Sequence, residues 1–334
     1  MKRPKTFHKT YSFIVAVVLF VAMFFVAILF GAADTTMKDL WHAITGSHTS
    51  DAISAIRDIR LPREIAAIFV GAALATAGAI MQGITRNPLA DPGLLGLTAG
   101  ANAMLAIKFV FFPSVSYFGT IFFCFIGALL GAALVFGIGS ARKGGLSPFR
   151  IVLAGAAVST FLIALEQGIS LYFKVSKDVT MWTAGGLIGT SWAQLKMIIP
   201  FIVVGILFAI MFSRQLTVLS LNEEVAIGLG QKIMIVKTIL FVIVIILAVT
   251  AVALAGNLVF IGLTIPHITR AIVGTDYRFI IPMSVLVGAT FMLFADTVAR
   301  TIHAPYETPI IAVVAILGLP FFLFIVRKGG NAFS

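Results

Sequence analysis

The chain has 334 residues, of which 60% are hydrophobic and only 11% are charged, and its mean hydropathy is +1.09. Soluble globular proteins carry about 25% charged residues and disordered chains have low hydrophobicity, so the composition excludes both classes. The net charge of +11 does not indicate a nucleic-acid-binding protein, because the basic residues fall in short clusters between apolar runs, as they do in membrane proteins.

A bilayer core about 30 Å thick requires roughly 20 apolar residues per helix, and this criterion predicts ten membrane-spanning segments. In chain order they cover about 12–31, 62–82, 93–112, 117–140, 149–173, 195–213, 233–254, 257–273, 279–298 and 308–326. The first segment is too long, and lacks the small-residue cleavage site, for a signal peptide. We therefore predict an all-α polytopic membrane protein that forms a single transmembrane domain over residues 1–334, with a cytoplasmic tail at 1–11.

Ten spans place both termini on the same side of the membrane. If that side is the cytoplasm, 15 of the 24 Lys and Arg residues lie inside and 9 lie outside. The excess of positive charge inside predicts an orientation with both termini in the cytoplasm.

A series of motifs begins at the start of the predicted second span and continues to the C-terminal region. They cover residues 60–63 (RLPR), 71–83, 87–96 (NPLADPGLLG), 182–186, 220–230, 255–270, 296–300 and 307–309. Together they resemble the permease subunits of ABC importers of the iron-siderophore and vitamin B12 type, the FecCD group. The resemblance implies the type II importer permease fold and a multi-pass protein of the bacterial cytoplasmic membrane. It also implies an iron(III)-siderophore as cargo, with vitamin B12 or heme as alternatives.

The same resemblance implies a set of partners and no cofactor held by this chain. A second permease subunit, identical or paralogous, would complete the pathway, and two cytoplasmic ATPase subunits would drive it. A substrate-binding protein or lipoprotein outside the membrane would deliver the iron chelate.

Three arginines are predicted at the outer mouth: Arg60 and Arg63 at the start of the second span and Arg300 at the end of the ninth. In the family, arginines at these positions pair with glutamates of the binding protein, and arginine is well suited to such bidentate pairing. The alternative is that they anchor the helix ends in the lipid headgroups. Asp296 is a second candidate partner for Arg300, four residues along the helix.

Two prolines within 86–93 exclude a regular helix between the second and third spans. The resemblance places Asn87 and Leu89 at a cytoplasmic gate, with Ser147 and Pro148 near a second gate element. An ordinary tight loop is the alternative interpretation.

The fifth span carries polar residues where lipid would favour apolar ones. Ser159, Glu166 and Ser170 share one helical face, and Thr160 lies beside it. Because a carboxylate in the hydrocarbon region normally faces a cavity or a partner, we expect these residues to line the translocation path. Hydrogen bonds between helices are the alternative.

The cytoplasmic segment at about 214–232 has the features of a short capped helix. Ser220 or Asn222 can cap it, and acidic residues in its first turn suit a helix N-terminus. The resemblance makes this segment the coupling helix that contacts the ATPase, whereas a solvated amphipathic turn is the alternative. Its predicted contact residues are Ser220, Leu221, Glu223, Glu224, Ala226, Gly228 and Gly230.

The sequence gives no sign of an enzyme or of a metal site. The glycines at 139–145 lack the Lys-Ser/Thr of a phosphate-binding loop, so ATP hydrolysis is expected from a partner. The lone Cys124 excludes a Cys-based zinc site, and His267 has no further ligand at a suitable spacing. A carrier driven by an ion gradient remains the rival hypothesis, with Glu166 as its candidate relay.

Overall fold

The computed structural model describes residues 5–30, 37–45, 50–140, 148–184, 186–258, 260–304 and 306–328. All regular elements within these ranges are helical, which confirms the all-α fold class. In chain order they are α1 (Lys5–Leu29), α2 (Met37–Thr45), α3 (Asp51–Ala55), the π-helix η1 (Ile56–Arg60), α4 (Leu61–Thr85), the 3-10 helix η2 (Pro92–Leu95), α5 (Leu97–Phe111), α6 (Tyr117–Ser140), α7 (Pro148–Tyr172), α8 (Ser176–Ala184), α9 (Trp192–Met211), α10 (Ser213–Leu221), α11 (Glu223–Gly228), α12 (Ile233–Ala255), α13 (Ile261–Val273), α14 (Tyr277–Thr301) and α15 (Ile310–Lys328).

Each of the ten predicted spans falls on a helix of the described chain. Seven helical stretches are long and apolar enough to cross a bilayer, and shorter apolar helices cover Leu97–Phe111, Ile261–Val273 and Ile310–Pro320. At 1.5 Å per residue, α5 and α13 are only about 22 and 20 Å long, so neither alone matches a core of about 30 Å. The count of ten crossings and the orientation remain predictions.

Some boundaries differ from the prediction. Helix α1 begins at Lys5, inside the segment predicted as a cytoplasmic tail, because no helix-breaking residue follows Pro4. The second span is longer than predicted, since α3, η1 and α4 form one continuous helical stretch over Ile53–Thr85. The π-helix η1 carries Arg57 and Arg60.

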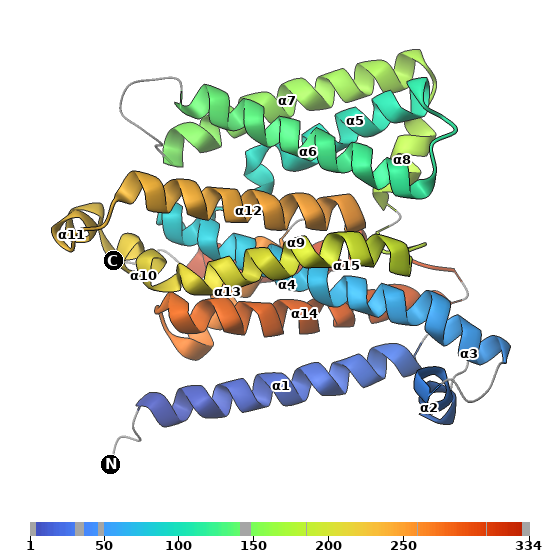
Figure 1. Cartoon of the computed structure of the whole chain (residues 1–334), viewed down its shortest axis with the longest axis horizontal. Helices are drawn as coiled ribbons and strands as arrows, with labels where there is room; N and C mark the ends of the chain where they lie inside the picture. Colours follow the sequence, from blue (N-terminus) through green and yellow to red (C-terminus); the bar gives the residue numbers. More distant parts are fainter. Residues whose placement is uncertain are drawn as a thin grey trace.

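Helix α4 lies at the centre of the fold, in contact with α9, α12, α13 and α14 (Figure 1). Helices α5, α6 and α7 form a layer at one edge of the molecule, and α1 lies at the opposite edge. The faces of α1 and α7 that point away from this core therefore remain open to lipid or to a partner.

Glycines allow the closest helix contacts. Gly71 of α4 faces Gly288 of α14, and any side chain at either position would collide with the backbone of the other. Gly127 of α6 likewise faces Gly100 of α5, and Gly131 faces the backbone at Gly96. The Gly-xxx-Gly pattern in α6 thus packs α6 against α5 within this chain.

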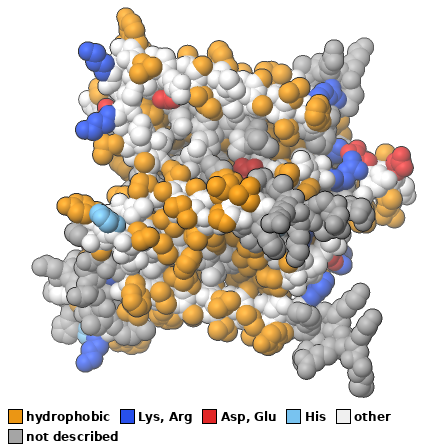
Figure 2. Space-filling model, turned by 180° about the vertical axis from the view of Figure 1, so that it is seen from behind, with side chains coloured by type: hydrophobic (Ala, Val, Ile, Leu, Met, Phe, Trp, Pro, Cys, Tyr) orange, Lys and Arg blue, Asp and Glu red, His pale blue; other side chains and the backbone are white. Residues whose placement is uncertain are grey.

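The surface is that of a protein embedded in a membrane. Figure 2 shows hydrophobic side chains across the middle of the molecule, with most Lys, Arg, Asp and Glu side chains toward its two ends. Many large apolar residues of the long helices are exposed, such as Leu19 at 57% and Phe161 at 63%. Such exposure is favourable only where lipid or another protein replaces water.

Candidate functional site

Ion pairs join the N-terminal end of α4 to the C-terminal end of α14. The Arg63 guanidinium donates to both carboxylate oxygens of Asp296 at 2.9–3.0 Å and to Oε1 of Glu307 at 2.8 Å. Arg300 pairs with Glu64 and, four residues along its own helix, with Asp296 at 3.0 Å. Asp296 is therefore a partner of Arg300, as predicted from the spacing, and it is also shared with Arg63.

Two of these arginines also hold the end of α1. Arg60 donates to the carbonyl oxygen of Ile28 at 2.8 Å, and Arg300 donates to that of Ala27 at 3.0 Å. The last four carbonyls of a helix lack intrahelical partners, and the negative end of its dipole favours cations. The guanidinium groups thus cap the C-terminal end of α1 and attach it to α4 and α14.

The three arginines predicted for docking do lie together, but they do not project into solvent. Their exposed fractions are 7% for Arg60, 7% for Arg63 and 4% for Arg300. Arg60 and Arg300 donate to main-chain carbonyls of α1, and Arg63 and Arg300 pair with carboxylates of this chain. The docking role and the headgroup anchoring both stay predictions. The acidic partners Glu64 and Glu307 were missed, although Glu64 adjoins Arg63 in the sequence.

The chain between α4 and η2 forms a tight turn at the opposite end of α4. Arg86 ends the helix with a φ of 51°, and the side-chain oxygen of Asn87 accepts from the Leu89 amide at 2.9 Å. Nε2 of His267 lies 3.0 Å from the carbonyl oxygen of Pro88, so α13 contacts this turn. Leu89 is 41% exposed. Ser147 lies outside the described residues, and Pro148 begins α7.

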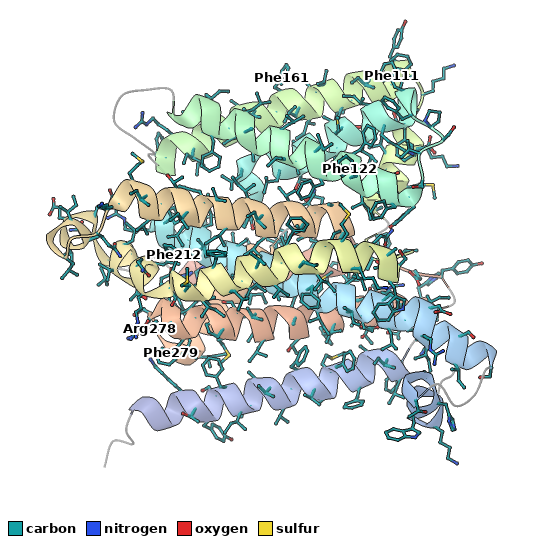
Figure 3. The ribbon with its side chains drawn as sticks, viewed as in Figure 1. Phe111, Phe122, Phe161, Phe212, Arg278 and Phe279 are labelled. Carbon is teal, nitrogen blue, oxygen red and sulfur yellow. The ribbon has the colours of Figure 1, made fainter. Side chains whose placement is uncertain are left out.

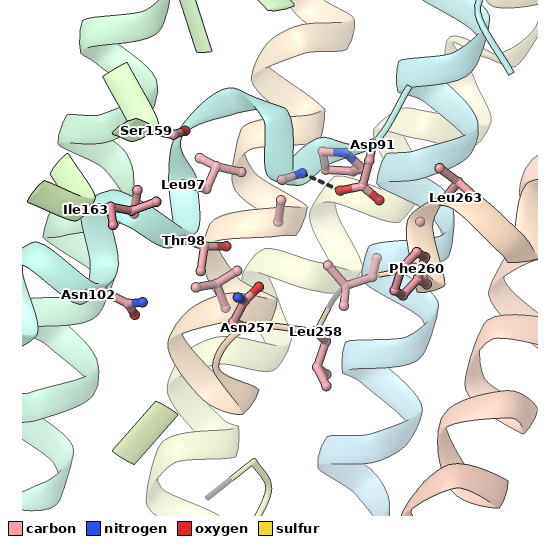
Figure 4. A pocket seen from close by; sticks show the side chains of 17 residues that line it. Asp91, Leu97, Thr98, Asn102, Ser159, Ile163, Asn257, Leu258, Phe260 and Leu263 are labelled. Atoms are coloured by element: carbon pink, nitrogen blue, oxygen red, sulfur yellow. Dashed lines mark hydrogen bonds between the residues drawn. The ribbon is translucent and has the colours of Figure 1, made fainter. Parts of the chain in front are cut away.

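Beyond this turn a cavity of about 350 Å³ opens between α4, α5, α7, α12 and α13 (Figure 4). Its lining is mainly apolar, with polar groups from Asp91, Thr98, Asn102, Ser159 and Asn257. Oδ1 of Asp91 accepts from the Gly93 amide at 2.7 Å, and burial raises the pKa of Asp91 to about 6. The polar atoms make this cavity suitable for water or for a polar ligand passing through the membrane.

The cavity includes one of the four predicted pathway residues. Ser159 lines it, whereas Thr160 donates to the carbonyl oxygen of Ala156 and faces outward on α7. Glu166 and Ser170 form a hydrogen bond of 2.8 Å about two to three turns along α7 from Ser159. The prediction that these two share a helical face is confirmed, but neither lines the cavity.

Sequence reasoning missed the remaining polar lining. Asp91 and Asn257 belong to irregular segments, and Asn102 lies in a short apolar span. The sequence around each residue therefore gave little indication that it lines a cavity. Only the packing of five helices shows that they surround the same space.

The predicted coupling segment consists of α10 and α11, joined at Asn222. The side chain of Asn222 accepts from the Glu224 amide at 3.1 Å, which confirms the predicted cap and selects Asn222 over Ser220. Gly230, with a φ of 78°, donates from its amide to the carbonyl of Ile227 and ends the turn as predicted.

Apolar residues of this segment are exposed at the end of the molecule. Leu221 is 69% exposed, Ile227 64% and Leu229 69%. Glu223 connects the segment to the rest of the fold, because its Oε1 accepts from Arg86 at 3.0 Å and from Lys237 at 2.8 Å. An apolar surface held in place by ion pairs is suited to contact another protein.

Comparison with known proteins agrees with this architecture. The FecCD transport family matches residues 19–328. This chain belongs to the FecCD transport family. It is 45% identical over 305 residues to the iron(3+)-hydroxamate import system permease protein FhuB of Bacillus subtilis (strain 168), covering 91% of this chain and 79% of FhuB.

Other FecCD relatives have similar coverage. The Fe(3+)-citrate import system permease protein YfmD of Bacillus subtilis (strain 168) is 39% identical and is covered over 95% of its length, against 96% of this chain. The ferric enterobactin transport system permease protein FepD of Escherichia coli (strain K12) is 36% identical, with 90% of each chain covered. A solved structure of a metal-chelate type ABC transporter in an inward-facing conformation matches with a TM-score of 0.82 at 27% identity, over 94% of this chain and 98% of that one.

Membership of the FecCD family decides between the functional classes. The chain is the permease of an ABC importer for iron chelates in the bacterial cytoplasmic membrane, and ATP hydrolysis belongs to partner ATPases. The ion-gradient-driven carrier, with Glu166 as its relay, is therefore wrong.

Proposed function

We propose that this permease carries an iron(III)-siderophore, with ferric hydroxamates as its first candidate cargo. The observation that supports this most directly is the 45% identity to FhuB over 91% of the chain. The identity is lower, at 36%, to the hemin permease HmuU of Yersinia pestis. It is 37%, over a shorter range, to the cobalamin permease BtuC of Halobacterium salinarum. Heme and vitamin B12 are the alternative cargoes.

In this proposal a second permease subunit covers the exposed face of α7, and the cargo passes between the two copies. Apolar residues such as Phe161, Leu165 and Leu171 are 41–72% exposed on that helix, beside the hydroxyl groups of Ser159 and Thr160. The cavity near Asp91 would open into this pathway, with Asn87 and Leu89 in the turn that closes its cytoplasmic end. Ser147 and Pro148 keep the proposed role of a second gate element. Glu166 and Ser170 would line the path farther along α7.

Two ATPase subunits would bind the exposed surface of α10 and α11, through Leu221 and the residues around Ala226 and Gly228. A substrate-binding lipoprotein or periplasmic protein would dock at the opposite end. Because Arg60, Arg63 and Arg300 are buried among acidic partners, we expect its carboxylates to compete with Glu307 for Arg63. Glu307 is the most exposed member of the cluster, with 33% of its side chain accessible.

The function is tested by purifying the complex and reconstituting it in proteoliposomes with its binding protein. We expect a second permease and an ATPase to co-purify. We also expect a ferric hydroxamate to enter only with ATP, even when ion gradients are collapsed. Uptake of heme or cobalamin in preference to ferric hydroxamates would contradict the proposed cargo, and uptake of none of these chelates would contradict the iron-siderophore assignment.

The docking role needs a conservative variant, since reversing a buried charge would also unfold the cluster. Glu307→Gln removes the charge that competes for one donor group of Arg63, while the Arg63–Asp296 pair remains. We expect this variant to bind the loaded binding protein at least as tightly as the parent at low salt. Weaker binding, with thermal stability unchanged, would show that the partner needs Glu307 and not Arg63.

A further inference from the structure

A long groove separates the middle of α1 from α13 and α14. Its volume is about 710 Å³, and its walls are almost entirely apolar. Along α1 it runs from Tyr11 to Val26, and the facing wall includes Ile268 of α13 and Met283 and Phe294 of α14. The arginine caps attach α1 at its C-terminal end, and along the groove α1 lies beside α14, with side chains of both helices forming the walls (Figure 3).

The groove has the length and polarity of a site for a hydrocarbon chain. Tyr11 and Val26 are fifteen steps of 1.5 Å apart along α1, which gives a length of about 22 Å. This length lies within the bilayer core of about 30 Å, and the apolar walls suit an acyl chain.

Basic residues lie at the N-terminal mouth of the groove. The ammonium of Lys9 on α1 stacks over the ring of Phe279 on α14, 3.8 Å from its centroid, directly before the first lining residue, Tyr11. Arg278 is exposed beside Phe279, and its charge is balanced by Asp276 at 2.6 Å (Figure 3). Lys9 therefore places a positive charge at this mouth.

From these observations we propose that the groove binds an anionic glycerophospholipid of the cytoplasmic leaflet. One acyl chain lies between α1 and α13–α14, and the phosphate headgroup lies at Lys9. The lipid fills the space that α1 leaves open and thereby holds α1 against the core along its length. This site lies at the edge of the fold opposite α7 and is separate from the proposed translocation path (Figure 1).

The experiment measures the lipids that remain on the full-length permease after purification in mild detergent from a membrane containing phosphatidylglycerol and phosphatidylethanolamine. Native mass spectrometry gives the number bound, and extraction with chromatography gives the headgroup. We expect about one lipid per permease, enriched in phosphatidylglycerol over the bulk membrane. Lys9→Gln should reduce this enrichment about fivefold, because one basic residue near the headgroups contributes about 1 kcal/mol.

A groove-filling variant tests the acyl-chain position. Ala22 lines the groove, so Ala22→Trp should remove the retained lipid, whereas Val18→Trp on the exposed face of the same helix should not. Lys232→Gln, the same neutralisation at an exposed lysine before α12, is the matched control for charge. Equal lipid retention by Ala22→Trp and the parent would overturn the acyl-chain site. A headgroup composition equal to that of the bulk membrane in both the parent and Lys9→Gln would overturn the anionic preference.

Discussion

The ion pair between Glu223 and Arg86 joins the proposed ATPase-binding segment to the turn at the end of α4. We predict that this pair couples the ATPase to the turn. Glu223 opens α11, and Arg86 precedes Asn87 and Leu89, the proposed gate residues. We expect Arg86→Gln to loosen this connection. Both side chains are 35–40% exposed, so the lost pair should reduce the free energy of unfolding by less than about 1 kcal/mol.

Glu223→Gln should be more harmful, since it also removes the negative charge that pairs with Lys237. That ammonium donates to Glu223 at 2.8 Å, and only 6% of the lysine side chain is exposed. A hydrogen bond between charged groups contributes about 1.5–3 kcal/mol, so the total loss of stability should be about 2–4 kcal/mol. Arg86→Gln is therefore the variant in which a loss of coupling to the ATPase can be measured with little loss of folding stability.

The assay is ATP-driven uptake of the iron chelate by the reconstituted complex, with ATP hydrolysis measured in the same vesicles. For Arg86→Gln we expect the rate of ATP hydrolysis to stay within about twofold of the parent. The uptake per ATP should fall, because the turn after α4 has lost the ion pair that joins it to α11. Arg86→Lys should restore most of the ratio. An unchanged ratio in Arg86→Gln, with Tm also unchanged, would refute the mechanical link.

Further predictions concern stability, and thermal unfolding in detergent measures each of them. Arg63→Gln leaves the carboxylate of Asp296 buried without its main partner and should cost about 3–5 kcal/mol, whereas a loss under 1 kcal/mol would mean that the cluster is solvated. Gly127→Ala should lower the free energy of unfolding by about 1–3 kcal/mol, because the new methyl group collides with α5. Gly137→Ala places its methyl group in open space and should be neutral or stabilising. Asp91→Asn should stabilise the protein in a pH-dependent manner. Because the folded state raises the pKa of this carboxyl to about 6, ionisation opposes folding increasingly between about pH 4 and pH 6, so the gain should grow across this window to at most about 3 kcal/mol. A pH-independent gain would contradict the cause assigned to the shift.

The local features of the coupling segment were predictable because the interactions that form them are local. Asn222 caps α11 through an amide two residues away, and Gly230 ends it through a carbonyl three residues away. Asp296 and Arg300 are likewise neighbours on one helical face. The residue types and their spacing predicted the end at Gly230 and the contact of Asp296 with Arg300, whereas they left Ser220 and Asn222 both open as the cap.

By itself, the sequence determined that this protein is an all-helical membrane permease of the FecCD type, because the bilayer requires long apolar helices and the family motifs occur in order along the chain. The tertiary structure decided which partners the functional residues have. Arg63 and Asp296 are 233 residues apart, and Arg60 and Arg300 cap a helix that the sequence could not place beside them. The cavity at Asp91 and the groove along α1 also depend on how separate helices pack, since a space between helices has no pattern in any one of them.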